Sequence, residues 1–543
     1  MASFGQRWPD AATTSRAWYR SCRSRGLEGA GISGSNRLAN PLWSGVRLAL
    51  VVALGALSLA NPALAQERAV DSVADGEAAE RRERDPDYLR AAVEESFFLA
   101  VGAAWYWIDR DKNAVDWDFD SWTQRFDRSA FRFDNNRFQV NWIFHPFAGS
   151  SYYGFARANE LHAGWAFAYT FLTSFLWEWL LEFKERVSIN DQIATPVGGM
   201  ALGEFWTKLS WWLHHRGTTP ARSAAAWTLG LGVRAHQAID GEGPEAAALA
   251  GMHARFRLNL GASVVLDGHA PDVVGTVGFE GRIVDLRGWH RDGTFSRRFG
   301  DANFASLRGS AGLGESGGSF ALEADTLVAG FHAQALRGDL ATAPGVLPGA
   351  VYGASATVAA AIGYSYRRTD YGGYGERLGV IHLPGFGFES VLAHGLTRLR
   401  FSLRGHGDFA SADVDGAYQR WADAHPDART KTILERESYF YGWGASARIG
   451  LELEVGRFHT GVRAAVGQWW SHEGLDRTQE AVTDDVEAVA RRVAIDHWAR
   501  VELPRGLHVE ARYQELRRRD RVGAEQVGER RLRRVGIAVG ITR

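Results

Sequence analysis

The stretch between His145 and Glu204 contains ionisable side chains inside an apolar, aromatic sequence. Glu178 and Glu182 lie four residues apart in the run FLWEWLLEF, so they are neighbours on one face of a helix. A carboxylate in such surroundings is costly unless it is paired, hydrogen-bonded or bound to a metal ion. Two carboxylates one turn apart can share a proton, hold a metal ion together with a histidine, or accept hydrogen bonds within a helical core. The sequence does not decide among these roles, and hydrogen bonding within a helical core is the one that we expect.

The same stretch supplies candidates for two kinds of chemistry. In hydrolysis, a histidine would act as base, a serine as nucleophile, and a carboxylate would orient the base. The catalytic candidates are His145, Ser150, His162, Glu178 and Glu182. The candidate metal ligands are His162, Glu178, Glu182 and Glu204. The stretch from His145 to Glu204 contains no G-x-S-x-G elbow, no H-E-x-x-H motif and no phosphate-binding loop, so no reaction and no cofactor is predicted.

The candidate residues require helices to position them. We predict one long helix from about residue 153 to 183, with Glu160, Ser174, Glu178 and Glu182 on one side. The alternation of residues 138–144 predicts a short extended segment that leads into this region.

A second helix is expected after the polar residues 188–191. Thr195 followed by Pro196 is typical of a helix N-cap and the first helical position. Gly199 and Gly203 would let another helix approach the backbone closely, beside Glu204.

The N-terminal residues are typical of an export signal. Arginines precede an apolar run at 48–60, and Ala63-Leu64-Ala65 has the small-x-small pattern of a cleavage site. We predict a cleaved signal peptide with an extended n-region over residues 1–65, with a signal anchor as the alternative, and a flexible linker over 66–87. The only cysteine, Cys22, precedes the cleavage site, so the mature chain would contain no thiol. Apolar residues at helical spacing from Tyr88 to Trp107 begin a helical domain, residues 88–216.

A set of spaced motifs in this domain resembles a known family. The motif residues are Asp134, Asn135, Phe138, Asn141, His145, Pro146, Gly149, Ser150, Tyr152, Tyr153, Ala156, Arg157, Trp177-Glu178, Asn190-Asp191, Thr195-Pro196 and Gly198-Gly199. Between about residues 105 and 204 the chain resembles domain of unknown function 3943, an uncharacterised bacterial envelope family. The resemblance implies an exported envelope protein, often with a β-rich C-terminal half, and it implies no activity.

From residue 217 onward, glycine is frequent and apolar residues alternate with polar ones, the period-two pattern of strands. Residues 493–503 and 507–513 show it on both sides of a turn at Pro504-Arg505-Gly506. Similar segments begin near Trp227 and continue to the C-terminal residues. We therefore predict an α+β protein in which the helical domain precedes a large antiparallel β-barrel of the outer-membrane type, with about 12–14 strands over residues 217–543. Arginines on the alternate faces would point into a polar lumen.

A water-soluble sandwich or propeller could alternate in the same way. Strand lengths near 9–11 residues, short turns that alternate with polar loops at 410–432 and 471–487, and the export signal favour the membrane barrel. Against it, the chain ends in Thr542-Arg543 and not in the aromatic residue common in bacterial barrels.

Three functions follow as hypotheses. The first is a Gram-negative outer-membrane barrel in contact with membrane lipid, whose helical domain is periplasmic or plug-like, packed on or inside the barrel, and acts in transport, gating or envelope assembly. The second is an envelope enzyme that acts on lipid or glycan through the His, Ser and Glu candidates. The third is a soluble periplasmic β-rich protein that binds a small molecule. The formal net charge of -1 gives no indication of nucleic-acid binding.

Overall fold

The computed structural model describes residues 85–109, 125–126, 130–182, 186–215, 219–229, 231–241, 252–267, 270–338, 349–472 and 485–543. All of them belong to one compact unit, Gly45–Arg543. The predicted signal peptide and most of the predicted linker lie outside the described residues.

Twelve antiparallel strands close into a barrel, as the sequence pattern predicted. Their order around the barrel is β7-β6-β4-β3-β15-β14-β13-β12-β11-β10-β9-β8, and pairing of β7 with β8 closes the ring. A further strand, β5 (Gly293–Phe299), pairs with β7 beyond the end of β6. The twelve barrel strands are β3 (Met252–Leu266), β4 (Asp272–Asp285), β6 (Phe304–Leu313), β7 (Gly317–Gly338), β8 (Val351–Tyr371), β9 (Tyr374–Gly395), β10 (Thr397–Asp413), β11 (Tyr439–Val455), β12 (Phe458–Ser471), β13 (Ala488–Glu502), β14 (Leu507–Val522) and β15 (Glu525–Thr542).

The two faces of the barrel wall differ because successive side chains of a strand point to opposite sides. On β15, Val535, Ile537 and Val539 are exposed on the outer face. Arg534, which precedes Val535 and so faces the opposite side, donates a hydrogen bond to Tyr371 of β8, a strand separated from β15 by four others around the ring. Such a contact is made only across the lumen, so the lumen is polar and the outer face apolar, as predicted.

The described part of the segment before the barrel consists of helices and two strands of two residues each. Its elements are α3 (Tyr88–Asp109), β1 (Phe131–Arg132), η3 (Val140–Phe144), α5 (His145–Ala158), α6 (Ala163–Leu176), η4 (Trp177–Leu181), β2 (Val187–Ser188), α7 (Asp191–Ile193), η5 (Ala194–Gly198), α8 (Gly199–His215), α9 (Pro220–Leu229) and α10 (Leu231–Ile239). We call residues 88–239 of this part the helical segment. Among the described helices, none is both long enough and apolar enough to cross a membrane.

Several sequence-based expectations about this segment are wrong. The long helix expected from about 153 to 183 breaks between α5 and α6, because Glu160 adopts a left-handed conformation (φ 59°) and His162 caps α6 by accepting from the Gly164 N–H at 3.2 Å. Thr195 is not an N-cap, since the chain is already helical from Asp191.

Residues 138–144 are helical rather than extended. Phe138 and Trp142 are four residues apart and both pack on the barrel, so the apolar spacing is that of a helix face. The strand expected near Trp227 is the helix α9, whose alanine-rich sequence favours a helix. The helical elements thus continue to Ile239, past residue 217 where the pattern placed the change to strands.

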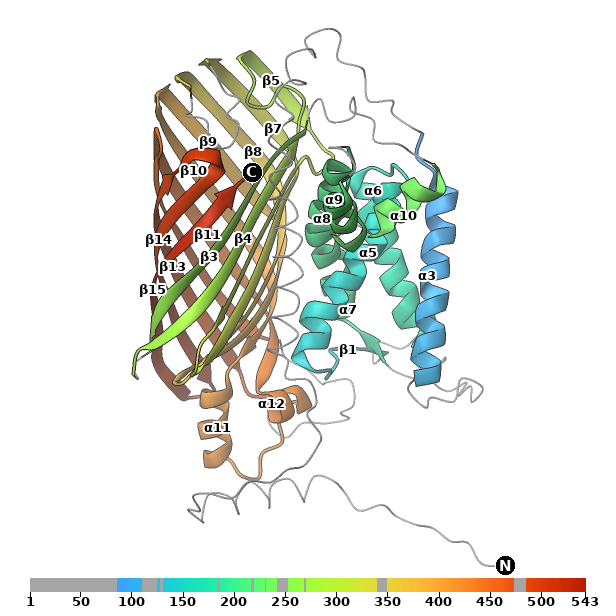
Figure 1. The fold of residues 1–543 in the computed structure, drawn as a ribbon. Coiled ribbons are helices and arrows are strands. Elements are labelled where there is room, and N and C mark those ends of the chain that lie inside the picture. Colours follow the sequence, from blue (N-terminus) through green and yellow to red (C-terminus); the bar gives the residue numbers. More distant parts are fainter. Residues whose placement is uncertain are drawn as a thin grey trace, which may run out of the picture. The chain divides into compact units, whose positions relative to one another are not determined.

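The helical segment packs against the outer face of the barrel wall (Figure 1). Gly281 of β4 faces the ring of Phe205 in α8, whereas its neighbours Glu280 and Arg282 make ion pairs inside the lumen. On β7, Thr326 donates to the Ala201 carbonyl of α8 at 3.5 Å, whereas Asp325 points into the lumen. Of the two placements expected, on the barrel or inside it, these contacts correspond to the first.

Candidate functional site

A pair of two-residue strands assembles a polar group between the helices and the barrel. β1 and β2 pair in parallel, so Asp134, just after β1, meets Asn190 and Asp191, just after β2. The Asp134 N–H donates to Asn190 Oδ1 at 2.9 Å, and the Asp191 N–H donates to Ser188 Oγ at 3.3 Å. These hydrogen bonds fix both aspartates to the same short sheet.

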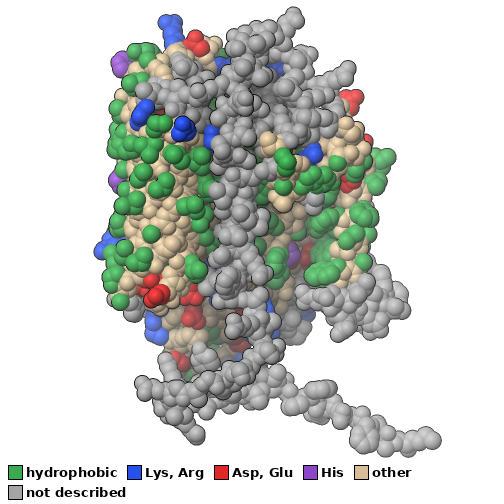
Figure 2. Space-filling view, viewed as in Figure 1, with side chains coloured by type: hydrophobic (Ala, Val, Ile, Leu, Met, Phe, Trp, Pro, Cys, Tyr) green, Lys and Arg blue, Asp and Glu red, His purple; other side chains and the backbone are tan. Residues whose placement is uncertain are grey.

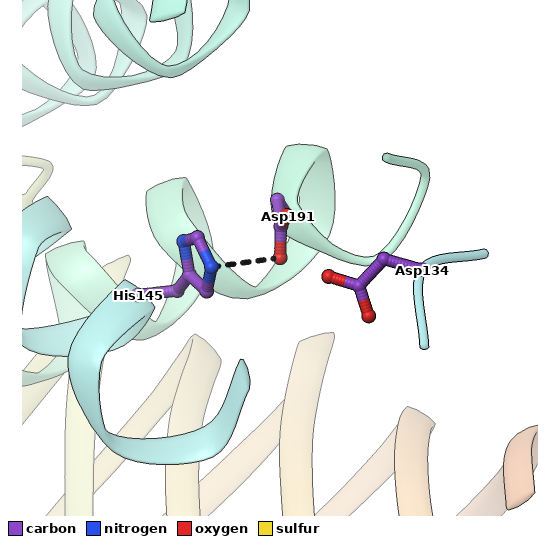
Figure 3. A group of neighbouring side chains, drawn as sticks. All are labelled: Asp134, His145 and Asp191. Carbon is purple, nitrogen blue, oxygen red and sulfur yellow. Dashed lines mark ion pairs between the residues drawn. The ribbon is translucent and has the colours of Figure 1, made fainter. Parts of the chain in front are cut away.

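His145, the first residue of α5, completes the group (Figure 3). Its Nε2 lies 3.3 Å from Asp191 Oδ1, and one ligand atom from each of Asp134, His145 and Asp191 lies within 4.8 Å of the others. Both aspartates are buried, and the His145 side chain is 20% exposed. We call these three residues the Asp134–His145–Asp191 group.

The barrel contributes to this group through β11. Tyr441 donates its hydroxyl to Asp134 Oδ1 at 2.6 Å, and Asn141 of η3 donates to the same oxygen at 2.9 Å. Asn136 donates its side-chain amide to Asp134 Oδ2 at 2.9 Å. The neighbouring Tyr439 donates to the Asn136 carbonyl at 2.8 Å. The two carboxyl oxygens of Asp134 thus accept three hydrogen bonds from neighbouring side chains.

The arrangement supports two kinds of chemistry. Two carboxylates and an imidazole are a ligand set for a divalent metal ion. Alternatively, Thr195 Oγ1 lies 3.5 Å from His145 Nδ1, while Asp191 lies at the other ring nitrogen. A hydroxyl, an imidazole and a carboxylate in series form the arrangement used in acyl transfer, although Thr195 itself is buried here.

Of the residues selected from sequence, His145 belongs to this group and Glu178 supports it. Glu178 Oε2 accepts from the N–H of Ser188 at 2.9 Å, so it holds β2 in place from η4. The Glu182 carbonyl accepts from Arg125 at the end of η4. Ser150 donates to the Phe147 carbonyl within α5, at 2.7 Å.

The remaining two candidates lie in other environments. His162 is half exposed at the start of α6, with Nε2 at 3.8 Å from Asp301. Glu204 is fully buried and pairs with Arg157 at 3.1 Å and with Lys208 at 2.8 Å. The structure therefore does not bring His162, Glu178, Glu182 and Glu204 to one position, and within the described residues the sets that could share one ion are Asp134–His145–Asp191 and Glu452–Glu454–His459.

Asp134, Asp191 and Thr195 were not selected from sequence as site candidates, because the criterion was an ionisable group inside an apolar run. Their signal was present in the motifs, because all three belong to the residues that carry the family resemblance. Tyr439 and Tyr441 carry no such signal, since they lie on a barrel strand about 300 positions from Asn141.

Comparison with family models finds one match, within the helical segment. Residues 130–233 match the family model described as Domain of unknown function (DUF3943), which confirms the resemblance seen in the motifs. No curated protein matches this chain.

Solved outer-membrane proteins align with most of their length. The translocator domain of the autotransporter NalP from Neisseria meningitidis is 13% identical, with 59% of this chain and 97% of that chain covered and a TM-score of 0.20. A porin is 8% identical, with 53% and 100% covered and a TM-score of 0.18. A loop-deletion mutant of OmpT, an outer-membrane protein of Vibrio cholerae, is 7% identical, with 54% and 100% covered and a TM-score of 0.19. The barrel itself is established by the strand pairing described above.

Proposed function

We propose that this protein resides in the outer membrane of a Gram-negative bacterium, and that its barrel is a closed scaffold on which the helical segment acts in envelope assembly. The observation that carries this proposal is that ion pairs cross the lumen, while the conspicuous buried polar group lies outside it, between the helices and the wall. A role at the wall of the barrel fits this distribution better than passage through the lumen.

The crossing ion pairs join strands far apart in the ring. Arg463 of β12 lies 2.7 Å from Glu280 of β4, although four strands separate them on the shorter path. Arg448 of β11 donates to Asp325 of β7 at 2.9 Å, across three intervening strands. Pairs of this kind occupy the space through which a solute would have to pass.

A helical cap adds to the closure at one end of the barrel. The connection between β10 and β11 forms α11 (Asp415–Ala424) and α12 (Thr432–Glu437), which lie at this end in Figure 1. Trp421 and Leu434 of the cap are buried against the lumen-facing Phe440 and Val522. An apolar cluster that covers this end of a charged lumen favours a closed scaffold.

The membrane location is supported by the outer face of the barrel. On β12, β13 and β15, the exposed outer positions include Val462, Val466, Val501, Val535, Ile537 and Val539. A soluble sandwich would bury such a belt, whereas a membrane barrel places it against lipid. Membrane lipid is therefore the proposed partner, and the predicted signal peptide the proposed route of export.

Planar-bilayer conductance of the full chain, purified from an outer-membrane fraction and checked by heat-modifiability on a gel, tests the closed scaffold. We expect no stable conductance steps from the wild-type protein. A variant that combines replacement of residues 415–437 by a short turn with R448A and R463A serves as a positive control and should conduct. Steady conductance of the wild type would overturn the proposal in favour of transport. A protein recovered from the soluble periplasm without a heat shift would overturn the membrane location.

A second function is favoured by one observation, the series Thr195, His145 and Asp191. It supports the envelope enzyme, with His145 as base and Asp191 as the group that orients it. Incubation of purified wild-type protein with lipid and glycan fractions tests this by release of fatty acid or sugar. Loss of release in both D191N and H145Q, with the heat shift retained, would support the enzyme. Equal release from wild type and variants would refute it.

A further inference from the structure

The outermost helix, α3, carries an apolar stripe on its exposed side. Residues at every fourth position along α3 are exposed in the presence of the rest of the chain: Leu89 (76%), Val93 (60%), Phe97 (71%), Val101 (53%) and Trp105 (59%). Apolar exposure of this extent marks a surface that contacts something other than water. Figure 2 shows apolar side chains on the outer side of the helices as well as on the barrel.

From Tyr88 to Tyr106, the charged side chains of α3 are turned inward or lie near its start, and the uncharged Ser96 is the polar residue exposed along its length. Glu95 is buried, and Thr173 of α6 donates to it. Arg90 pairs with Asp240 at 2.8 Å, near the start of α3. Helices that face lipid keep their polar side chains toward the bundle interior or at the membrane surface.

The contacts with the barrel place these helices at the level of the strands. The helical segment touches the outer face near one end of the barrel, where Tyr441 follows the first residues of β11. It also touches the wall at Gly281 of β4, four residues before the other end of that strand. The contacts therefore extend along most of the wall, on the face that other strands present as the apolar belt.

We infer that the helical segment lies within the outer membrane beside the barrel, with the α3 stripe against lipid acyl chains. The inference rests on the proposed membrane location of the barrel. Because the strands of a membrane barrel lie in the hydrocarbon layer, a bundle seated on their outer face along most of their length occupies the same layer. The stripe is then the continuation of the barrel's lipid-facing belt.

Fluorescence quenching by brominated acyl chains tests whether lipid contacts the α3 stripe. Because Cys22 lies in the predicted signal peptide, single cysteines introduced at Phe97, at Ile537 of β15 and at Asp423 of the cap are the thiols that bimane labels. Each full-length variant is reconstituted in phosphatidylcholine vesicles with and without bromine and checked by heat-modifiability. We expect equal quenching at Phe97 and Ile537 and none at Asp423.

The outcomes separate the inference from the proposal beneath it. Quenching at Ile537 without quenching at Phe97 would overturn the lipid-facing stripe and leave the barrel in the membrane. Absence of quenching at both positions would overturn the membrane location itself. If a second copy of the chain covers the stripe, the Phe97→Cys variant will form disulfide-linked dimers and its bimane label will not be quenched. That result would show that the acyl-chain assignment is wrong.

Discussion

The indole ring of Trp142 in η3 lies directly against Gly379 on the outer face of β9. A Cβ built at Gly379 would lie 2.1 Å from Cδ2 of Trp142, far inside van der Waals contact. The same tryptophan stacks on Phe409 of β10 at 6.0 Å between ring centroids, and Tyr364 of β8 donates to its carbonyl. The helical segment is thus seated on three adjacent strands at a point where only glycine fits.

Substitution of Gly379 by alanine should weaken this seat without opening the barrel. Overpacking of a tight contact costs about 1–3 kcal/mol. The expected result is faster proteolysis of the helical segment with an unchanged heat shift of the barrel. Gly375 on the same strand is the matched control, because a Cβ there meets nothing within 4 Å. Equal protease resistance of G379A and G375A would show that the seat is not tight.

A second pair of glycines tests the packing inside the helical segment. A Cβ at Gly149 of α5 would lie 1.9 Å from the Thr195 carbonyl oxygen, whereas one at Gly154 of the same helix has only Thr207 Oγ1 at 3.9 Å. G149A should therefore lower the melting temperature of the helical circular dichroism signal and displace Thr195 from His145. G154A should be neutral or raise stability by up to about 1 kcal/mol, because alanine favours a helix. Similar melting temperatures for the two variants would contradict the close approach of α5 and η5.

The lumen ion pairs should contribute strongly to barrel stability. R448A removes the arginine that Glu323 and Asp325 share and leaves Glu323 with Arg308. Because these pairs are partly buried, the expected cost lies between the roughly 1 kcal/mol of an exposed pair and the about 3–5 kcal/mol of a fully buried one. The temperature at which the heat-modifiable band disappears should fall accordingly. Arg521, which pairs with the half-exposed Glu487, is the control, and R521A should cost less than about 1 kcal/mol. A small and equal effect of both substitutions would mean that water, not the ion pair, solvates the lumen carboxylates.

The strands were predictable from sequence because each carries a period-two pattern over many residues. The segments expected at 252–266, 351–366 and 439–454 match β3, β8 and β11 closely. β5 was missed, since it has seven residues and only Phe295 and Phe299 among them are apolar and at least partly buried. The placement of the helices against the wall was not predictable, because an apolar face indicates burial but not what covers it.

The candidate site was only partly predictable for a different reason. His145 and Glu178 were selected because an ionisable group in an apolar stretch is costly to bury without a partner. Asp134 and Asp191 meet through strands of two residues each, too short to show any pattern. Tyr441 reaches Asp134 over 307 positions of sequence, a contact that depends on closure of the whole barrel.

The bond between Tyr441 and Asp134 should be stronger than its neighbour because its acceptor is charged. Tyr439 and Tyr441 both extend from β11 to the chain after β1, but Tyr439 donates to the neutral Asn136 carbonyl. A hydrogen bond to an ionised group contributes about 1.5–3 kcal/mol, and one between neutral groups about 0.5–1.5 kcal/mol. In double-mutant cycles with D134N, monitored by the melting of the helical signal, Y441F should therefore show the larger coupling energy. Equal coupling for Y439F and Y441F would show that the Tyr441 hydroxyl makes no specific bond to Asp134, and that β11 does not hold this member of the Asp134–His145–Asp191 group in place.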